Sequence, residues 1–124
     1  MKDNMSKKFP CPCCGYLTLN EGPGKYDVCP ICYWEDDLSQ LRFPTMGGGA
    51  NKPSLLEAQT KFAETGAIEE RFLPHVRKPN ADDIRDVDWR PINTQIDHME
   101  VPERGRDYGT TYNKDLTTYY YWRR

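Results

Sequence analysis

The 124-residue sequence predicts an α+β fold in which a cysteine-bearing β-hairpin packs on one or two helices and a C-terminal β-hairpin region follows. Three features predict this fold: two Cys-x-x-Cys steps, a capped amphipathic stretch that begins at Ser54, and a C-terminal segment rich in Thr, Tyr and Trp. They divide the chain into residues 1–79, with the cysteines and the capped stretch, and residues 80–124, a charged connector and an aromatic strand region. We expect both parts to pack on one body.

The two Cys-x-x-Cys steps have the spacing of a metal site. Cys11 and Cys14 form the first step, and Cys29 and Cys32 form the second, with fourteen residues between them. A tight turn over one step directs two sulfurs at the same ion, and Zn²⁺ prefers four thiolates in a tetrahedron. Four protein ligands leave no position for water or substrate, so the pattern predicts one structural Zn²⁺ per chain. Iron in a rubredoxin-like arrangement fits the same ligands.

The segment between the steps predicts a zinc-ribbon hairpin. Residues 16–19 and 25–28 are typical of short strands, and residues 20–24 are typical of a turn. Cys13 adjoins Cys14 inside the first knuckle, which is poor geometry for a further ligand. It is either a reactive thiol whose pKa the metal centre lowers or a small residue packed against the hairpin.

Composition narrows the class of protein. An odd total of five cysteines would leave an unpaired thiol in an oxidising compartment, and residues 1–10 lack the apolar core of a signal peptide. No apolar stretch approaches bilayer length. The formal charge is −2, and a zinc tetrathiolate makes the protein more acidic, which disfavours nucleic acid as a partner. We therefore expect a cytoplasmic metalloprotein.

Residues 54–66 predict a helix. Ser54 and Glu57 have the spacing of a capping box, and Gly66 is typical of a C-terminal stop. The predicted apolar face consists of Leu55, Ala58, Phe62 and Ala63. Residues 67–73 are compatible with a second short helix that Pro74 would end. We expect the helical unit to bury its apolar face on the hairpin.

An acidic run and a glycine run lie between the second knuckle and this helix. Glu35, Asp36 and Asp37 suit a hard cation or a basic partner, or else a solvated face. Residues 47–49 are three glycines of the kind that can cradle a phosphate at a helix N-terminus. Pro53 interrupts the Gly-Lys-Ser/Thr order of a P-loop, which argues against a nucleotide site.

These motifs, taken in order, resemble the bacterial cysteine-rich CPCC family. The resemblance covers roughly residues 9–79. It rests on Cys11-Pro12-Cys13-Cys14-Gly15, Cys29-Pro30-Ile31-Cys32, Trp34-Glu35-Asp36-Asp37, Gly48-Gly49-Ala50-Asn51, Ser54-Leu55-x-Glu57-Ala58 and Val76-Arg77-Lys78-Pro79. It implies a zinc-ribbon-like module in a bacterial cytoplasm. Because some members accompany toxin or secretion loci, it also implies an immunity role.

Beyond Pro79 the chain changes character. Residues 80–107 form a charged connector that Trp89 and Ile92 are placed to attach to the body. Residues 108–112 and 116–122 are rich in strand formers and predict a hairpin around a polar turn. Its aromatic residues either form a binding surface or pack half-buried on the body: Tyr119, Tyr120, Tyr121 and Trp122.

We expect a non-enzymatic, zinc-stabilised protein-binding module and, more specifically, a bacterial immunity protein that neutralises a cognate toxin. His75 and His98 are isolated in the sequence and suggest no catalytic constellation. The candidate partner-binding residues are Glu35, Asp36, Asp37, Asp82, Asp83, Tyr119, Tyr120, Tyr121 and Trp122. The alternative is a nucleic-acid-associated zinc ribbon with phosphate contacts from Lys7, Lys8, Arg123 and Arg124. An enzyme that uses Cys13 is the third possibility.

Overall fold

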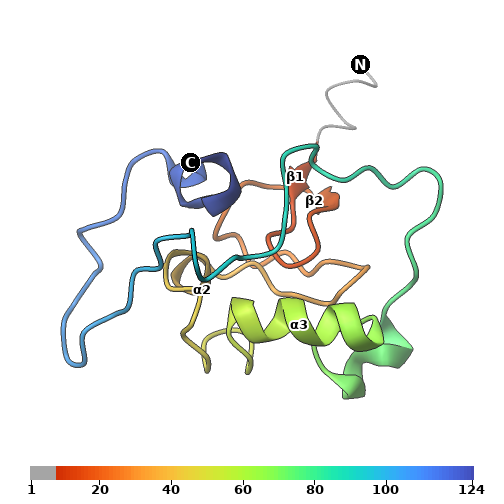
Figure 1. Ribbon diagram of the computed structural model, residues 1–124, viewed down its shortest axis with the longest axis horizontal. Coiled ribbons are helices and arrows are strands. Elements are labelled where there is room, and N and C mark those ends of the chain that lie inside the picture. Colours follow the sequence, from red (N-terminus) through yellow and green to blue (C-terminus); the bar gives the residue numbers. More distant parts are fainter. Residues whose placement is uncertain (1–7) are drawn as a thin grey trace.

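The computed structural model describes residues 8–124, so the predicted phosphate contact at Lys7 lies outside the described residues. Helix α3 runs along one side, and the β1–β2 hairpin and the C-terminal turns lie on the opposite side (Figure 1). The strands and α-helices are β1 (Phe9–Pro10), β2 (Leu17–Leu19), α2 (Leu38–Arg42) and α3 (Leu55–Thr65). The 3-10 turns are η1 (Glu70–His75), η2 (Leu116–Tyr119) and η3 (Tyr121–Arg123).

Strands pair across each cysteine knuckle, not between the two knuckles as predicted. β1 runs antiparallel to β2, with Phe9 opposite Leu19, and this hairpin encloses the first knuckle. An isolated bridge between Val28 and Glu35 encloses the second knuckle. The predicted pairing of residues 16–19 with 25–28 is wrong.

The backbone of Tyr26 explains the difference in pairing. Its φ of 61° is left-handed and interrupts an extended strand. The N–H of Tyr26 donates to the carbonyl of Asp36 at 3.1 Å, and the N–H of Asp36 donates to the carbonyl of Asp27 at 2.9 Å. Residues 25–28 therefore pair with the chain that leaves the second knuckle.

Helix α3 has the predicted ends. The Ser54 hydroxyl accepts from the Glu57 N–H, and the Glu57 carboxylate accepts from the Ser54 N–H, which is a complete capping box. Gly66 ends the helix with a φ of 99°, the left-handed conformation that glycine adopts without strain. The capped helix is confirmed.

The buried face of α3 differs from the prediction. Leu55, Ala58 and Gln59 are buried, whereas Phe62 is half-buried and Ala63 is exposed. A glutamine is tolerated inside because its amide is fully used. Its Nε2 donates to two acceptors, and its Oε1 accepts a backbone N–H at 2.9 Å.

The second helical segment is a 3-10 turn, displaced from the predicted helix over residues 67–73. Ala67 and Ile68 are buried and precede it, and the Ile68 N–H donates to the Cys32 carbonyl at 3.0 Å. Pro74 lies within η1 and does not end it. A proline lacks the N–H that a continuing α-helix would need, which keeps this segment short.

The C-terminal segment forms η2 and η3, so the predicted C-terminal β-hairpin is wrong. The Asp115 carboxylate accepts from the Thr117 N–H at 3.0 Å and starts the first 3-10 turn where a hairpin turn was expected. The side chains of residues 119–122 are buried, and the rings of Tyr120 and Trp122 stack at 4.7 Å. Burial of aromatic area outweighs strand propensity here.

The cysteine knuckles are part of the hydrophobic core. The buried side chains around them come from both parts of the sequence and include Leu19, Ile31, Trp34, Leu41, Leu55, Ile68, Tyr120 and Trp122. The connector also reaches this core as predicted, because Trp89 and Ile92 pack against it. Within residues 8–124, the helices are too short or too polar to cross a bilayer.

Candidate metal centre

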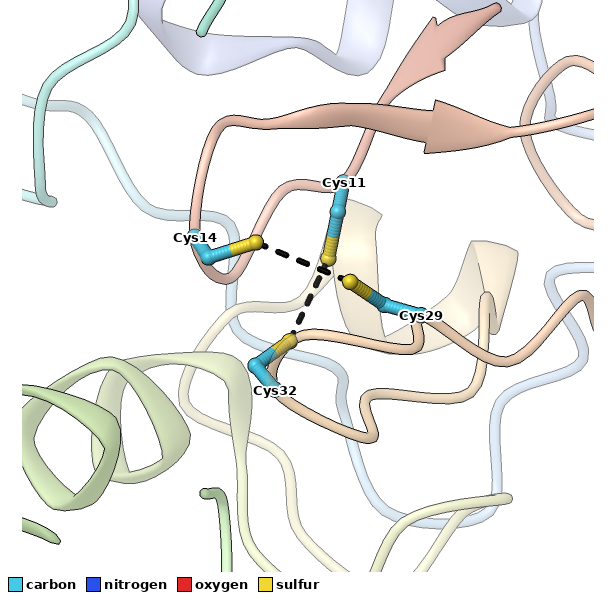
Figure 2. Close-up of side chains that lie close together, drawn as sticks. All are labelled: Cys11, Cys14, Cys29 and Cys32. Carbon is cyan, nitrogen blue, oxygen red and sulfur yellow. Dashed lines mark hydrogen bonds between the residues drawn. The ribbon is translucent and has the colours of Figure 1, made fainter. Parts of the chain in front are cut away.

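The two knuckles bring four cysteine sulfurs together in the core. The Sγ atoms of Cys11, Cys14, Cys29 and Cys32 lie within 4.8 Å of one another, and all four residues are buried (Figure 2). The Cys11–Cys32 and Cys14–Cys29 sulfur pairs are 3.6 and 3.7 Å apart. A tetrahedron with Zn–S bonds of about 2.3 Å requires sulfurs about 3.8 Å apart. The four residues are therefore positioned to hold a metal ion.

The two knuckles have equivalent backbones. Gly15 donates to the Cys11 carbonyl at 2.7 Å, and Tyr33 donates to the Cys29 carbonyl at 2.8 Å. Both donors have left-handed φ, 80° for Gly15 and 74° for Tyr33. Tyr33 bears a strain that glycine avoids, and its ring packs on Phe72 with centroids 4.5 Å apart. Packing thus fixes a turn that the sequence presents as different from the first.

Several donors point at the sulfurs. The Ile31 N–H and the Thr18 hydroxyl donate to Cys29 Sγ at 3.4 and 3.1 Å, and the Trp34 N–H donates to Cys32 Sγ at 3.4 Å. These bonds favour the thiolate form that a metal requires.

The electrostatics of the cluster are compatible with a bound cation. Hydrogen bonds from the neighbouring thiols and from Thr18 hold the pKa of Cys29 well below its usual range. Burial raises the pKa values of Cys11 and Cys32, so further thiolates are disfavoured without a compensating charge. A bound divalent ion supplies that charge and makes four buried thiolates compatible.

Cys13 is separate from the four-sulfur set. It is 1% exposed, and burial raises the pKa of its thiol. These are the properties of a packed residue, because a reactive cysteine needs access and a lowered pKa.

Residues far away in the sequence hold the first knuckle from outside. Gln59 and Trp89 both donate side-chain N–H groups to the Pro12 carbonyl at 3.0 Å. Arg85 Nε donates to the Cys14 carbonyl at 2.8 Å, and the Asp86 N–H donates to the Gly15 carbonyl at 2.8 Å. The sequence does not predict that Gln59, Arg85 and Asp86 support the knuckle, because nothing in their local pattern shows that they meet it.

The acidic run is internal, which corrects its prediction as a partner or cation surface. Asp37 caps α2 by accepting from Ser39 and also accepts from the Ala50 N–H at 2.8 Å. Asp36 is buried and accepts from the Gly24 N–H at 3.1 Å. Glu35 is half-buried. The two buried carboxylates thus accept hydrogen bonds from backbone amides.

The glycine run is a closed structural loop. A Cβ on Gly49 would lie 2.6 Å from Asp37 Oδ2, so only glycine fits there. Gln40 donates to the carbonyls of Met46, Asn51 and Pro53 and accepts from Asn51. The side chains of Asp37 and Gln40 fill the position where a phosphate would be cradled.

The other predicted binding residues do not converge on one surface. Asp83 is paired with Arg77 at 2.7 Å, whereas Asp82 is exposed. The predicted aromatic anchors are all buried, with exposures of 7% or less: Tyr119, Tyr120, Tyr121 and Trp122. Their prediction as an open binding surface is wrong, because they complete the core. Lys8 and Arg124 are exposed, and Arg123 pairs with Asp86 at 2.8 Å.

Comparison with known proteins gives one family. A family model described as "Cysteine-rich CPCC" matches residues 9–83, which is more than half of the chain. The matched region contains both knuckles and α3 and ends before Arg85, Asp86 and Trp89, three of the residues that hold the first knuckle. A search of curated proteins found no match.

Proposed function

The chain belongs to the cysteine-rich CPCC family, and from that premise we propose that it is a non-enzymatic protein-binding module whose fold is stapled by one Zn²⁺. The observation that carries the proposal is the position of the four sulfurs in the core, each on a fully buried residue. A metal held there has four protein ligands and no access for a substrate. Such a site contributes folding energy and no chemistry of its own.

Zinc is the ion that we propose. The sulfur–sulfur distances match a tetrahedral tetrathiolate, and the donors are soft. Native mass spectrometry and elemental analysis of protein purified from medium with zinc and iron should find one zinc per chain. Stoichiometric iron, with the visible absorption of a ferric tetrathiolate, would assign the centre to iron.

The specific function that we propose is immunity: the protein binds and neutralises a cognate toxin in the bacterial cytoplasm. Support comes from the resemblance to the cysteine-rich CPCC family, which implies an immunity role. The metal centre also supports it, because a small chain can use a metal staple to present a rigid surface. The low sequence pI of about 5.7 and the pairing of Arg123 with Asp86 favour a protein partner over nucleic acid.

Co-expression tests this function. The product of the adjacent gene is expressed alone, with the wild-type protein, or with Cys14→Ser, which lacks one ligand. We expect toxicity of the neighbour alone, rescue and a stable complex with the wild type, and loss of both with Cys14→Ser. A harmless neighbour, together with a purified holoprotein that retains DNA or RNA at physiological salt, would replace immunity with nucleic-acid binding.

A further inference from the structure

We propose that the groove between β1 and residues 84–87 is the docking surface for an acidic, apolar, extended segment of the partner protein. The inference rests on the proposed protein-binding function and adds where and what the protein binds. The groove has a volume of about 430 Å³ and opens beside the β1–β2 hairpin. Figure 1 shows this hairpin at the same end of the molecule as the C-terminal turns, whose Thr117 and Arg123 also line the groove.

The lining is apolar and accessible. Phe9, Pro10 and Leu17 of the hairpin contribute to it. Ile84 and Val87 of the connector also line it, with 64% and 92% of their surface exposed, and the Leu17 N–H donates to the Ile84 carbonyl at 2.9 Å. Neighbouring large apolar side chains left in water are a feature of interaction surfaces. The apolar lining favours peptide side chains over the sugar–phosphate backbone of a nucleic acid.

The groove is positively charged in a protein that is acidic overall. Lys8, Arg85 and Arg123 line it, and Asp86 is the acid that lines it among residues 8–124. Three positive charges and one negative charge leave +2, against a formal charge of −2 for the whole chain. The Asp86 side chain is only 7% exposed and accepts from Arg123 and Trp122. The positively charged side chains of the groove are therefore more accessible to an approaching segment than the Asp86 carboxylate is.

The two guanidinium groups are already fixed in place. Arg85 lies over the rings of Tyr16 and Trp89 at 4.7 and 5.0 Å and donates through Nε to a backbone carbonyl. Arg123 lies over Tyr120 at 4.9 Å while it pairs with Asp86. Fixed guanidinium groups lose little conformational entropy on binding, and their planar forks suit carboxylates. Arg85 and Arg123 would thus favour glutamate or aspartate in a bound segment.

The chain's own N-terminal residues are a poorer occupant. Residues 1–7 contain Lys2 and Lys7 against Asp3, which gives +2 − 1 = +1 for their side chains. Like charge opposes their placement in a positive groove. Charge complementarity instead favours a separate chain of acidic and apolar residues.

A defined peptide tests the groove. The probe is the capped hexapeptide Leu-Glu-Val-Glu-Leu-Glu, with twins in which Gln or Lys replaces Glu, titrated into ¹⁵N-labelled zinc-loaded protein. We expect amide shifts at Leu17 and residues 84–87 with the Glu peptide, weakened by added salt. The Gln and Lys twins should bind at least about fivefold more weakly. Val87→Asp should lower affinity about tenfold, because it removes apolar contact and adds like charge.

Val101→Asp is the matched control, since Val101 is 67% exposed and does not line the groove. It should leave peptide affinity unchanged. Equal binding of all three peptides, shifts away from the groove, or preference for an oligonucleotide such as oligo(dT) would overturn the proposal. So would Glu-peptide binding that appears only after deletion of residues 1–7, because the groove would then belong to the chain's own N-terminus. If the Val87→Asp variant neutralises the neighbouring toxin as well as the wild-type protein does, the groove proposal is overturned and the immunity proposal is unaffected.

Discussion

At the scale of single residues, the centre depends on which cysteines face one another. Cys13 and Cys14 are adjacent in the sequence, yet only Cys14 directs its sulfur into the four-sulfur set. The other thiol is buried in the same core but is not one of the four sulfurs. Neighbouring cysteines with different environments make a matched pair for mutagenesis.

Cys14→Ser should abolish stoichiometric zinc and unfold the region around the knuckles, because an incomplete tetrahedron loses the binding energy that folding depends on. Cys13→Ser should keep one zinc per chain and lose on the order of 1 kcal/mol, since it only buries a hydroxyl in place of a thiol. Elemental analysis and circular dichroism of the two variants measure this. Equal loss of zinc in both would contradict the ligand assignment.

Asp36 is a second residue with a testable environment. Burial raises the pKa of its carboxyl to about 7, repulsion from Asp27 and Asp37 adds to the shift, and the Gly24 N–H opposes it. An unfolded aspartate has a pKa of about 3.9. Between these values the folded state binds the proton more tightly. The protonated Asp36 carboxyl therefore contributes to the free energy of unfolding at low pH, and this contribution is lost as pH rises through 7.

Asp36→Asn keeps an acceptor for the Gly24 N–H and removes the charge. The variant should be more stable than the wild type at pH 8.5, by on the order of 1–2 kcal/mol, with a smaller difference at pH 5.5. Urea melts of the zinc-loaded wild type and variant at both pH values measure the difference. Because the two proteins are compared at the same pH, effects of pH on metal binding are common to both and cancel. Asp82→Asn at an exposed position is the control. A wild-type–variant difference that stays constant with pH would refute the assigned environment.

At the scale of elements, α3 is defined by its caps and by a polar residue on its buried face. Ser54 and Gly66 satisfy backbone groups at its two ends. Gln59 connects the middle of the helix to the first knuckle through Pro12 and to the connector through Ile92. The helix is therefore a link between the metal centre and the C-terminal residues as well as a cover for the core.

Ser54→Ala should lower the free energy of unfolding by about 1 kcal/mol, because the Glu57 N–H loses the hydroxyl of the buried Ser54 as its acceptor. Thr60→Ala is the control within the same helix, since Thr60 is exposed and alanine favours helix. The control should be neutral or slightly stabilising. Denaturant melts in which both substitutions cost the same would show that the cap contributes nothing specific.

At the scale of the whole molecule, the residues beyond the family match complete the core. Residues 84–92 bind the first knuckle and α3, and the last turns bury Tyr119, Tyr120, Tyr121 and Trp122 against the same body. The connector itself forms little regular structure between these contacts. It is held by the body and cannot be expected to fold alone.

A chain that ends after Asp115 should lose cooperative unfolding, because four buried aromatic residues contribute more free energy than the net stability of a small domain. A chain that ends after Trp122 is the control, since it removes only the exposed Arg123 and Arg124. Its melting temperature should fall by only a few degrees. Thermal melts followed by near-ultraviolet circular dichroism measure both. A normal melt for the shorter chain would mean that the C-terminal turns are dispensable.

Local chemistry in the sequence determined the ligand set and the capped helix. Four thiols at Cys-x-x-Cys spacing and a Ser–Glu pair three residues apart each define their geometry within a few residues. Trp89 and Ile92 were also named from the sequence as attachment points, and both pack against the core.

Tertiary structure alone decided strand pairing, the conformation of the last residues and the roles of the polar groups. Val28 pairs with Glu35 because Tyr26 adopts a left-handed backbone, which a strand pattern does not reveal. The Thr- and Tyr-rich segment has strand propensity, yet it turns to bury its rings. Asp36, Asp37 and Gln59 look like surface residues in the sequence. They lie inside because distant backbone groups satisfy them, and such partners exist only once the chain has folded.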